Sequence, residues 1–163
     1  MQKQIHPYLA AGLLILSACN FSAGTKKNLA SGLSYQYNGL RINDVYLSDS
    51  AGGKLAGNEV PYNSRVGLVI AGISGFMPNN GKVFPGFVID ITDKDGHRIM
   101  TETPPDVFAQ NSGFTEREAS ILLGSVKIME PLKTGATYHL KGHLWDKNNS
   151  DNTVDAEAEI VVK

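Results

Sequence analysis

Two histidines, a lysine and the only tryptophan of the chain lie in one short segment near the C-terminus, YHLKGHLW. In a β-strand, alternate side chains share a face, so His139, Lys141, His143 and Trp145 would all point the same way. Imidazole and indole groups on one face could bind a metal ion, contact a ligand or transfer protons. Residues four apart on a strand are about 13 Å apart, whereas two ligands of one zinc ion lie within about 4 Å of each other. The two histidines therefore cannot share an ion, and we predict neither a metal site nor another cofactor.

The last segment of the chain, TVDAEAEIVVK, supplies an acidic partner for this face. Its apolar side chains alternate with polar ones, among them Asp155, Glu157 and Glu159. If the two segments form a hairpin, outward positions must lie opposite one another, which puts His143 opposite Asp155 or Glu157. Such cross-strand pairs contribute about 0.2–1 kcal/mol each. Two interpretations remain open: a solvated ladder of charges, or a ligand-contacting face built around Trp145 and the two histidines.

Two connections carry aromatic and apolar side chains among turn residues, GFMPNNGKVFPG at 75–86 and PPDVFAQNSGF at 104–114. Their candidate ligand-contact residues are Phe76, Met77, Phe84 and Phe108. In a β-sandwich such side chains can fold over an open end of the core, but loops on a rigid scaffold also carry many binding sites. The sequence leaves both roles open, closure of the core and contact with a partner or ligand.

Motifs for catalysis and a surface for nucleic acid are both missing from the sequence. AGISGF lacks the spacing of a nucleophile elbow, and neither a zinc-protease helix motif nor a phosphate-binding glycine loop occurs. The segment DKNNSDNTVDAE has oxygen-bearing residues at EF-hand-like positions, but Asp151 stands where that loop needs glycine. With 15 basic and 16 acidic residues, the chain offers no electrostatic footprint for nucleic acid. We therefore predict no catalytic residue and no nucleic-acid partner.

The elements that must position these residues are β-strands. Short apolar runs such as RVGLVIA and GFVIDIT alternate with clusters of Gly, Pro, Asn and Asp, and no long stretch has helical periodicity. Thr115 and Glu118 have the spacing of a capping box, which predicts a single helical turn before the strand ASILLGSVKIM. About seven to nine strands fit the pattern, which favours an all-β, antiparallel two-sheet sandwich.

Residues 132–138, LKTGATY, resemble the L-x-P-G-x-x-Y segment that precedes the penultimate strand of fibronectin type III and related immunoglobulin-like domains. Thr134 stands where that segment has proline. In those domains the tyrosine hydroxyl bonds to upstream backbone and forms a tyrosine corner. The resemblance implies a structural role for Leu132, Gly135 and Tyr138, and an immunoglobulin-like sandwich over residues 33–163.

The N-terminus has the layout of a secretory signal peptide, with a lysine before the apolar run LAAGLLIL. This run is shorter than the roughly 20 residues that span a bilayer, so no permanent transmembrane anchor is predicted. Its end, LSAC, resembles the lipobox of bacterial lipoproteins, whose cysteine is acylated and becomes the first mature residue. The resemblance implies a leader over residues 1–18 and a lipidated Cys19. For a Gram-negative envelope, Asn20 after the cysteine implies the outer membrane.

Cys19 is the only cysteine, so a mature chain that carries lipid there has neither a disulfide nor a thiol for catalysis or zinc binding. The segment that follows is small and polar, and we expect residues 19–32 to form the lipidated cysteine and a flexible tether. Together these features predict a lipid-anchored, non-catalytic binding or accessory module for an envelope protein or glycan. The alternatives are a structural subunit of a surface assembly and, third, a hydrolase of envelope polymers.

Overall fold

The computed structural model describes residues 22–27, 32–101, 106–109 and 112–163, so the expected leader and Cys19 lie outside the described residues. Within these ranges the chain forms ten strands and one turn of 3-10 helix. In chain order they are β1 (Ala23–Lys27), β2 (Ser34–Asn38), β3 (Asp44–Ser48), β4 (Glu59–Val60), β5 (Arg65–Ala71), β6 (Pro85–Thr92), β7 (Arg98–Thr101), the 3-10 helix η1 (Glu118–Ser120), β8 (Ile121–Lys127), β9 (Thr137–Asp146) and β10 (Asn149–Val162). In these ranges, no element is a helix with the length and apolar character that a membrane span requires.

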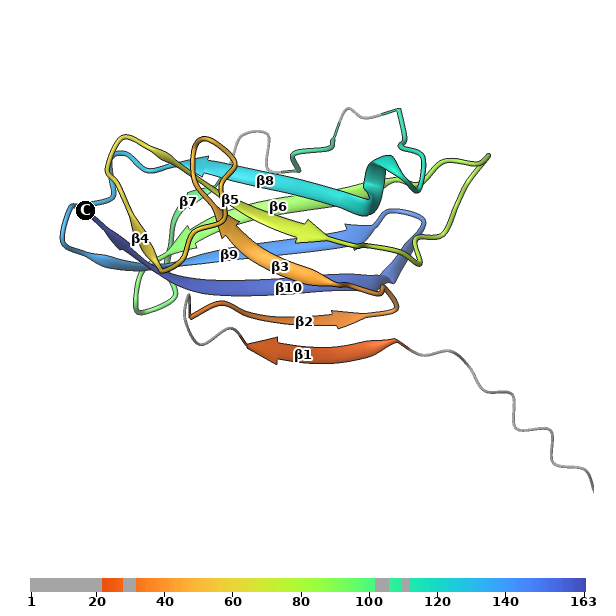
Figure 1. Ribbon diagram of the computed structural model, residues 1–163, viewed down its shortest axis with the longest axis horizontal. Coiled ribbons are helices and arrows are strands. Elements are labelled where there is room, and N and C mark those ends of the chain that lie inside the picture. Colours follow the sequence, from red (N-terminus) through yellow and green to blue (C-terminus); the bar gives the residue numbers. More distant parts are fainter. Residues whose placement is uncertain (1–21, 28–31, 102–105, 110–111) are drawn as a thin grey trace, which may run out of the picture.

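The strands form two facing sheets (Figure 1). The large sheet has the order β1-β2-β10-β9-β6-β7, and β4 adds to it by pairing in parallel with the end of β10. The small sheet has the order β3-β5-β8. In an immunoglobulin-like sandwich, strands A, B and E share one sheet and strands C, F and G share the other. The small sheet β3-β5-β8 has the strand order A-B-E, and β6-β9-β10 within the large sheet has the order C-F-G. The expected all-β, two-sheet sandwich is confirmed.

The described residues contain one strand more than the upper limit expected from the sequence, and β1 is an unexpected one. Ala23–Lys27, which the sequence assigns to a flexible tether, pairs antiparallel with β2 along its whole length. The expectation of a tether through these five residues is therefore wrong. A small, polar segment can form an edge strand because it needs backbone pairing on one side only. The apolar pattern on which strand prediction relies is absent from β1.

The core lies between the sheets and is built from alternate residues of each strand. The core-facing residues expected from the alternation in β9 and β10 are all buried, namely Tyr138, Leu140, Gly142 and Leu144 in β9 and Val154, Ala156, Ala158, Ile160 and Val162 in β10. Full burial of one large apolar side chain contributes about 1.5–3 kcal/mol. This set of side chains therefore decides which face of the hairpin lies against the small sheet.

Two glycines let the sheets approach each other closely. Gly142 in β9 faces Leu68 of β5, and Gly124 in β8 faces Phe87 and Ile89 of β6. A β-carbon at either glycine would overlap these side chains. Because the three side chains are fully buried, the densely packed interior leaves them little room to move.

The segment 132–138 forms the connection into β9. The backbone N–H of Lys133 donates a 3.0 Å hydrogen bond to the Tyr138 hydroxyl oxygen, and Leu132 is buried. Gly135 has a φ angle of +81°, a left-handed conformation that glycine adopts more readily than other residues. Tyr138 thus bonds to backbone a few residues upstream, which is the interaction that defines a tyrosine corner.

A reciprocal pair of hydrogen bonds precedes β8. The Thr115 N–H donates to Glu118 Oε2 at 2.8 Å, and the Glu118 N–H donates to Thr115 Oγ1 at 3.2 Å. This is the predicted capping box, and the single turn that follows it is the 3-10 helix η1. Backbone and side-chain hydrogen bonds from Thr115 lower the pKa of the Glu118 carboxyl below its ordinary value.

The close approach of the sheets predicts the effect of one added methyl group. Gly142→Ala should lower the free energy of unfolding by about 1–3 kcal/mol, because the new β-carbon has to displace the buried Leu68 side chain. Gly57→Ala is the matched control, since a β-carbon at Gly57 meets no atom within 4 Å. The measurement is urea unfolding of both variants, and equal midpoints would contradict the packing argument.

Candidate functional site

The outward face of β9 and β10 carries the histidines and the tryptophan that the sequence singles out. His143 lies opposite Asp155, and Lys141 lies opposite Glu157. This is one of the two registers expected from the sequence, and it is confirmed. A basic strand and an acidic strand therefore lie side by side on this face.

Three ion pairs join the two strands. Nδ1 of His143 lies 2.7 Å from Oδ1 of Asp155, and Nδ1 of His139 lies 3.0 Å from Oε1 of Glu157. The other oxygen of Glu157, Oε2, lies 3.8 Å from Nζ of Lys141. These five side chains are between 32% and 47% exposed, and ion pairs at such exposure contribute about 0–1 kcal/mol each. The ladder adds little stability, and its charged groups remain accessible to a ligand.

Trp145 lies at one end of this row of side chains. Its ring stacks with that of His143, with the ring centroids 5.4 Å apart and the planes inclined by 19°. On the neighbouring strand β6, Gly86 is the residue paired with Trp145, and a β-carbon at Gly86 would overlap the indole. The missing side chain on β6 thus makes room for the half-buried indole. Together the two rings form an aromatic pair on the outward face.

A groove of about 500 Å³ lies over the same face of the large sheet, with residues of five strands around it. Across the sheet from β1 to β6, its polar side chains include Thr25, Gln36, Asp155, His143, Lys141 and Asp90. A second hollow, of about 420 Å³, shares Thr25, Gln36 and Asp155 with the groove and extends toward Ala23. The five-strand width of the groove depends on β1, because Thr25 belongs to that strand (Figure 1).

Asp90 lines the β6 side of the groove, and its two carboxylate oxygens differ in their surroundings. Its Oδ2 pairs with the Arg98 guanidinium at 2.9 Å. In the part of the chain that the structure describes, its Oδ1 is buried and has no hydrogen-bond partner. A buried acceptor without a donor costs about 1–3 kcal/mol.

The Phe-rich connections are mainly part of the core. Phe76 is buried, and Phe84 is half-buried. Phe108 stacks on Phe87 with centroids 6.3 Å apart and meets Phe114 edge-on at 5.4 Å. Of the two roles that the sequence leaves open, these rings take the first, which is to cover the core. Phe76 therefore makes no surface contact with a ligand, because hydrophobic burial places its ring inside.

Met77 is the exposed member of this group, with 54% of its surface accessible. Its N–H donates to Oδ2 of the buried Asp146 at 2.6 Å, and its carbonyl oxygen accepts from Nδ2 of Asn148 at 2.8 Å. Oδ1 of Asp146 also accepts from the Asn148 N–H at 2.9 Å. Asp146 and Asn148, at the turn between β9 and β10, thus hold the loop through the backbone N–H and carbonyl oxygen of Met77.

Asp106 has the same role in the second connection. Its Oδ1 accepts from the backbone N–H groups of Phe87 and Phe108, both at 3.0 Å, and its Oδ2 pairs with Nζ of Lys147 at 2.7 Å. Burial raises the pKa of this carboxyl, but the hydrogen bonds from Lys147, Phe87 and Phe108 outweigh that effect. The pKa of Asp106 therefore lies below its ordinary value.

The turn between β6 and β7 gathers three groups of the types that bind metals. Potential ligand atoms of Asp93, Asp95 and His97 lie within 4.8 Å of one another. Asp93 Oδ1 accepts from the backbone N–H groups of Asp95 and His97, both at 2.9 Å, and Oδ2 pairs with His97 Nδ1 at 3.2 Å. An aspartate that bonds backbone two residues on is typical of a turn. The turn by itself accounts for the cluster, and we assign no metal to it.

Comparison of the sequence with protein-family models and with curated proteins finds no match. The geometry of the groove and the chemistry of its side chains are therefore the basis for assigning a function.

The sequence pattern identified the residues that β9 and β10 contribute to the groove, but not those that β2 and β6 contribute. Ser34 and Gln36 of β2, on either side of the buried Tyr35, and Val88 of β6, between the buried Phe87 and Ile89, line it as well. This alternation was a signal for outward orientation. Which strands would lie beside β9 and β10 was not encoded in any local pattern, because strand neighbours are set by the sheet topology.

The lowered pKa of Asp106 predicts a pH-dependent contribution to stability. A carboxyl whose pKa is lower in the folded state stabilises the fold above its unfolded pKa of about 3.9, and this contribution is lost as the pH falls through the folded value. Asp106→Asn should therefore lower the urea midpoint at neutral pH, and the difference from the natural chain should shrink in acid. A difference that stayed constant from neutral to acid pH would contradict the assignment.

Proposed function

We propose that the chain is a lipid-anchored, non-catalytic binding module of a bacterial envelope, and that it takes a hydroxyl-rich ligand, such as a glycan, in the groove over the large sheet. The observation that carries the proposal is the groove itself. It combines carboxylate acceptors from Asp155 and Glu157 with donors from Lys141 and Gln36. Hydroxyl groups both donate and accept hydrogen bonds, so they match a surface that offers both kinds of partner.

The aromatic pair supports a sugar ligand over an apolar one. The imidazole of His143 lines the groove, and the indole of Trp145 stacks on that imidazole. An aromatic side chain with an apolar body and a polar edge suits a ligand that has both C–H and O–H surfaces. A partner-binding adaptor would instead be expected to expose a contiguous apolar patch over the Phe-rich connections, where Phe76 is buried and Phe108 packs on Phe87.

Solvent exposure supports binding over catalysis. The pair His143 and Asp155 resembles the base and its orienting group in several enzymes, but both side chains are more than two-fifths exposed. Catalytic acids and bases are commonly tuned by burial and by neighbouring charges held away from water. An open, solvated polar face is suited to reversible hydrogen bonding with a ligand.

A structural subunit that packs by strand addition is the second candidate, and β1 is the observation that favours it. This strand pairs with β2 on one side and forms the end of the described large sheet (Figure 1). An edge strand presents unpaired backbone groups to another chain. Lys26 and Lys27 stand on β1, and lysines on an edge oppose such pairing. We therefore place this candidate second.

The binding proposal is tested by titration with envelope glycans, with the fluorescence of Trp145 as the reporter because it is the only tryptophan. Glu157→Gln should weaken binding by about ten- to a hundredfold, since removal of one charge-assisted hydrogen bond costs about 1.5–3 kcal/mol. Glu159→Gln on the same strand is the matched control, because Glu159 does not line the groove.

Three results would contradict the proposal of a glycan site in the groove. The first is the absence of any spectral or calorimetric response to the glycans, and the second is equal weakening by the two substitutions. The third is concentration-dependent assembly of the purified chain without glycan binding, which would favour strand addition instead.

The anchor is tested separately. Cys19→Ala should release the exported protein from the membrane fraction, because the thiol that carries the lipid is lost and a single acyl-bearing residue supplies the attachment. Membrane fractionation followed by immunodetection measures the change, and Ser17→Thr in the same segment is a control that keeps the cysteine. Undiminished retention of the alanine variant would refute lipidation at Cys19.

A further inference from the structure

The start of β1 lies at the same end of the sandwich as the loop that carries Met77. Figure 1 shows β1 beginning at the end where β5 runs into the loop toward β6 and where β9 turns into β10. The turn between β6 and β7 lies at the opposite end, as does the C-terminus (Figure 1). The N-terminal segment therefore joins the end that carries the β5–β6 loop and the β9–β10 turn, and not the end that carries the β6–β7 turn.

Hydrogen bonds fix this end as one unit. The Gly39 N–H donates to the Ser22 carbonyl oxygen at 2.7 Å, which holds the start of the described chain to the end of β2. Asn38 Nδ2 donates to the Asp151 carbonyl oxygen at 2.8 Å, and Asn152 Nδ2 donates to that of Gly75 at 3.2 Å. The loop that continues to Met77 is thus tied, through β10 and β2, to the residue where β1 begins.

The link between this end and Cys19 is short. Three residue steps separate Cys19 from Ser22, and a fully extended chain covers at most about 3.6 Å per step, or roughly 11 Å. A tether running to residue 32 would have had a reach of about 20 Å as a random coil. Because Ala23–Lys27 is part of the sheet, a lipid on Cys19 holds one particular end of the domain at the bilayer.

We infer that this end of the sandwich, which carries the exposed Met77, rests on the lipid surface, so that the strands stand away from the bilayer and the groove opens to the side. The inference deepens the proposed function and rests on lipidation of Cys19. Met77 is more than half exposed and is held by Asp146 and Asn148, so its apolar side chain is presented outward at little further entropic cost.

Two exposed cations lie at this end, and the Glu118 carboxylate, whose pKa the Thr115 hydrogen bonds lower, lies close enough to Lys82 for the lysine's charge to lower that pKa further. Arg41 exchanges backbone hydrogen bonds with Ser74 in the Met77 loop, and Lys82 pairs with Asn79 across the tip of that loop. Both cationic side chains are exposed and belong to the end that the short link brings to the bilayer. Cations near anionic headgroups are attracted to them within a Debye length.

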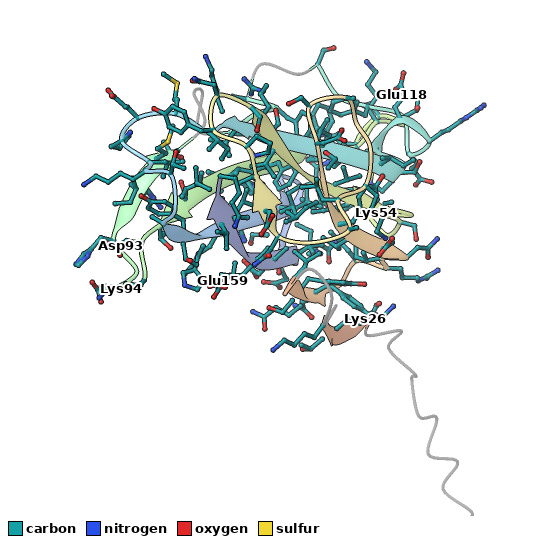
Figure 2. All side chains as sticks on the ribbon, turned by 60° about the vertical axis from the view of Figure 1, so that its left-hand side comes forward. Lys26, Lys54, Asp93, Lys94, Glu118 and Glu159 are labelled. Carbon is teal, nitrogen blue, oxygen red and sulfur yellow. The ribbon has the colours of Figure 1, made fainter. Side chains whose placement is uncertain are left out.

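One methionine and two cations bind a bilayer weakly by themselves. A lipid on Cys19 raises the fraction of molecules in which this contact is formed. A short link keeps the loop at a high effective concentration of lipid, so that a weak contact is populated without a second strong anchor. At the opposite end, Asp93 and Lys94 lie on the turn between β6 and β7 (Figure 2). The inference therefore makes opposite predictions for probes at Met77 and at Lys94.

The test uses the full lipidated protein in vesicles of phosphatidylethanolamine and phosphatidylglycerol. Cys19 is the only natural cysteine and is consumed by the lipid, so Met77→Cys and Lys94→Cys each give a single site for an environment-sensitive fluorophore. Lys94 is a suitable control because its side chain is 83% exposed. We expect a blue shift and a several-fold loss of iodide quenching at position 77 in vesicles, with no change at position 94.

A second variant separates orientation from attachment. Insertion of ten Gly and Ser residues between Asn20 and Phe21 adds a reach of about 17 Å and should restore iodide quenching at position 77 while the protein stays bound to the vesicles. Equal quenching at positions 77 and 94 in vesicle-bound protein overturns the orientation and leaves the anchor standing.

Loss of the protein from the vesicles overturns the anchor and the inference together. Protection at position 77 that persists in detergent, without a bilayer, also overturns the inference, because a protein contact would then be responsible. These outcomes distinguish failure of the membrane contact from failure of the proposed lipidation.

Discussion

The pairing of β9 with β10 is the constraint on which the rest of the fold depends. β10 also pairs with β2, and β9 also pairs with β6, so the register of this hairpin sets the positions of four strands. A slip of one residue would turn Lys141 and His143 into the core and Leu140 and Leu144 out of it. Burial of unpaired charge costs far more than any cross-strand pair returns. The alternation therefore allows only registers that keep the apolar residues of both strands on the core face, and the length of the loop between β9 and β10 determines which of these forms.

The same alternation makes the outward face polar, and this explains why one surface serves two roles. His143, Asp155 and Glu157 belong both to the ion-pair ladder and to the groove. Because they are partly exposed, their mutual attraction is screened by water and they remain free to exchange hydrogen bonds with a ligand. Gly86 adds a steric condition, since its missing side chain lets Trp145 lie beside His143.

The small strand β1 links the groove to the N-terminal segment. It adds Thr25 to the groove, and the described chain is held to the end of β2 from Ser22 onward. A sheet edge formed by backbone pairing alone thus widens the outward face and shortens the connection to Cys19. Both proposed properties, ligand binding and orientation at a lipid surface, depend on this strand, although its side chains contribute almost nothing to the core.

Features that follow from local alternation and spacing can be read from the amino-acid sequence alone. The sequence identified the faces of β9 and β10, the pairing of Thr115 with Glu118 and the all-β class, because each depends on residues close in the chain or on a two-residue period. The burial of Phe76, the strand at Ala23–Lys27 and the meeting of Thr25 and Asp90 at one groove become visible only in the folded chain. These depend on which strands become neighbours, and backbone pairing and the closing of two sheets settle that without leaving a local pattern in the sequence.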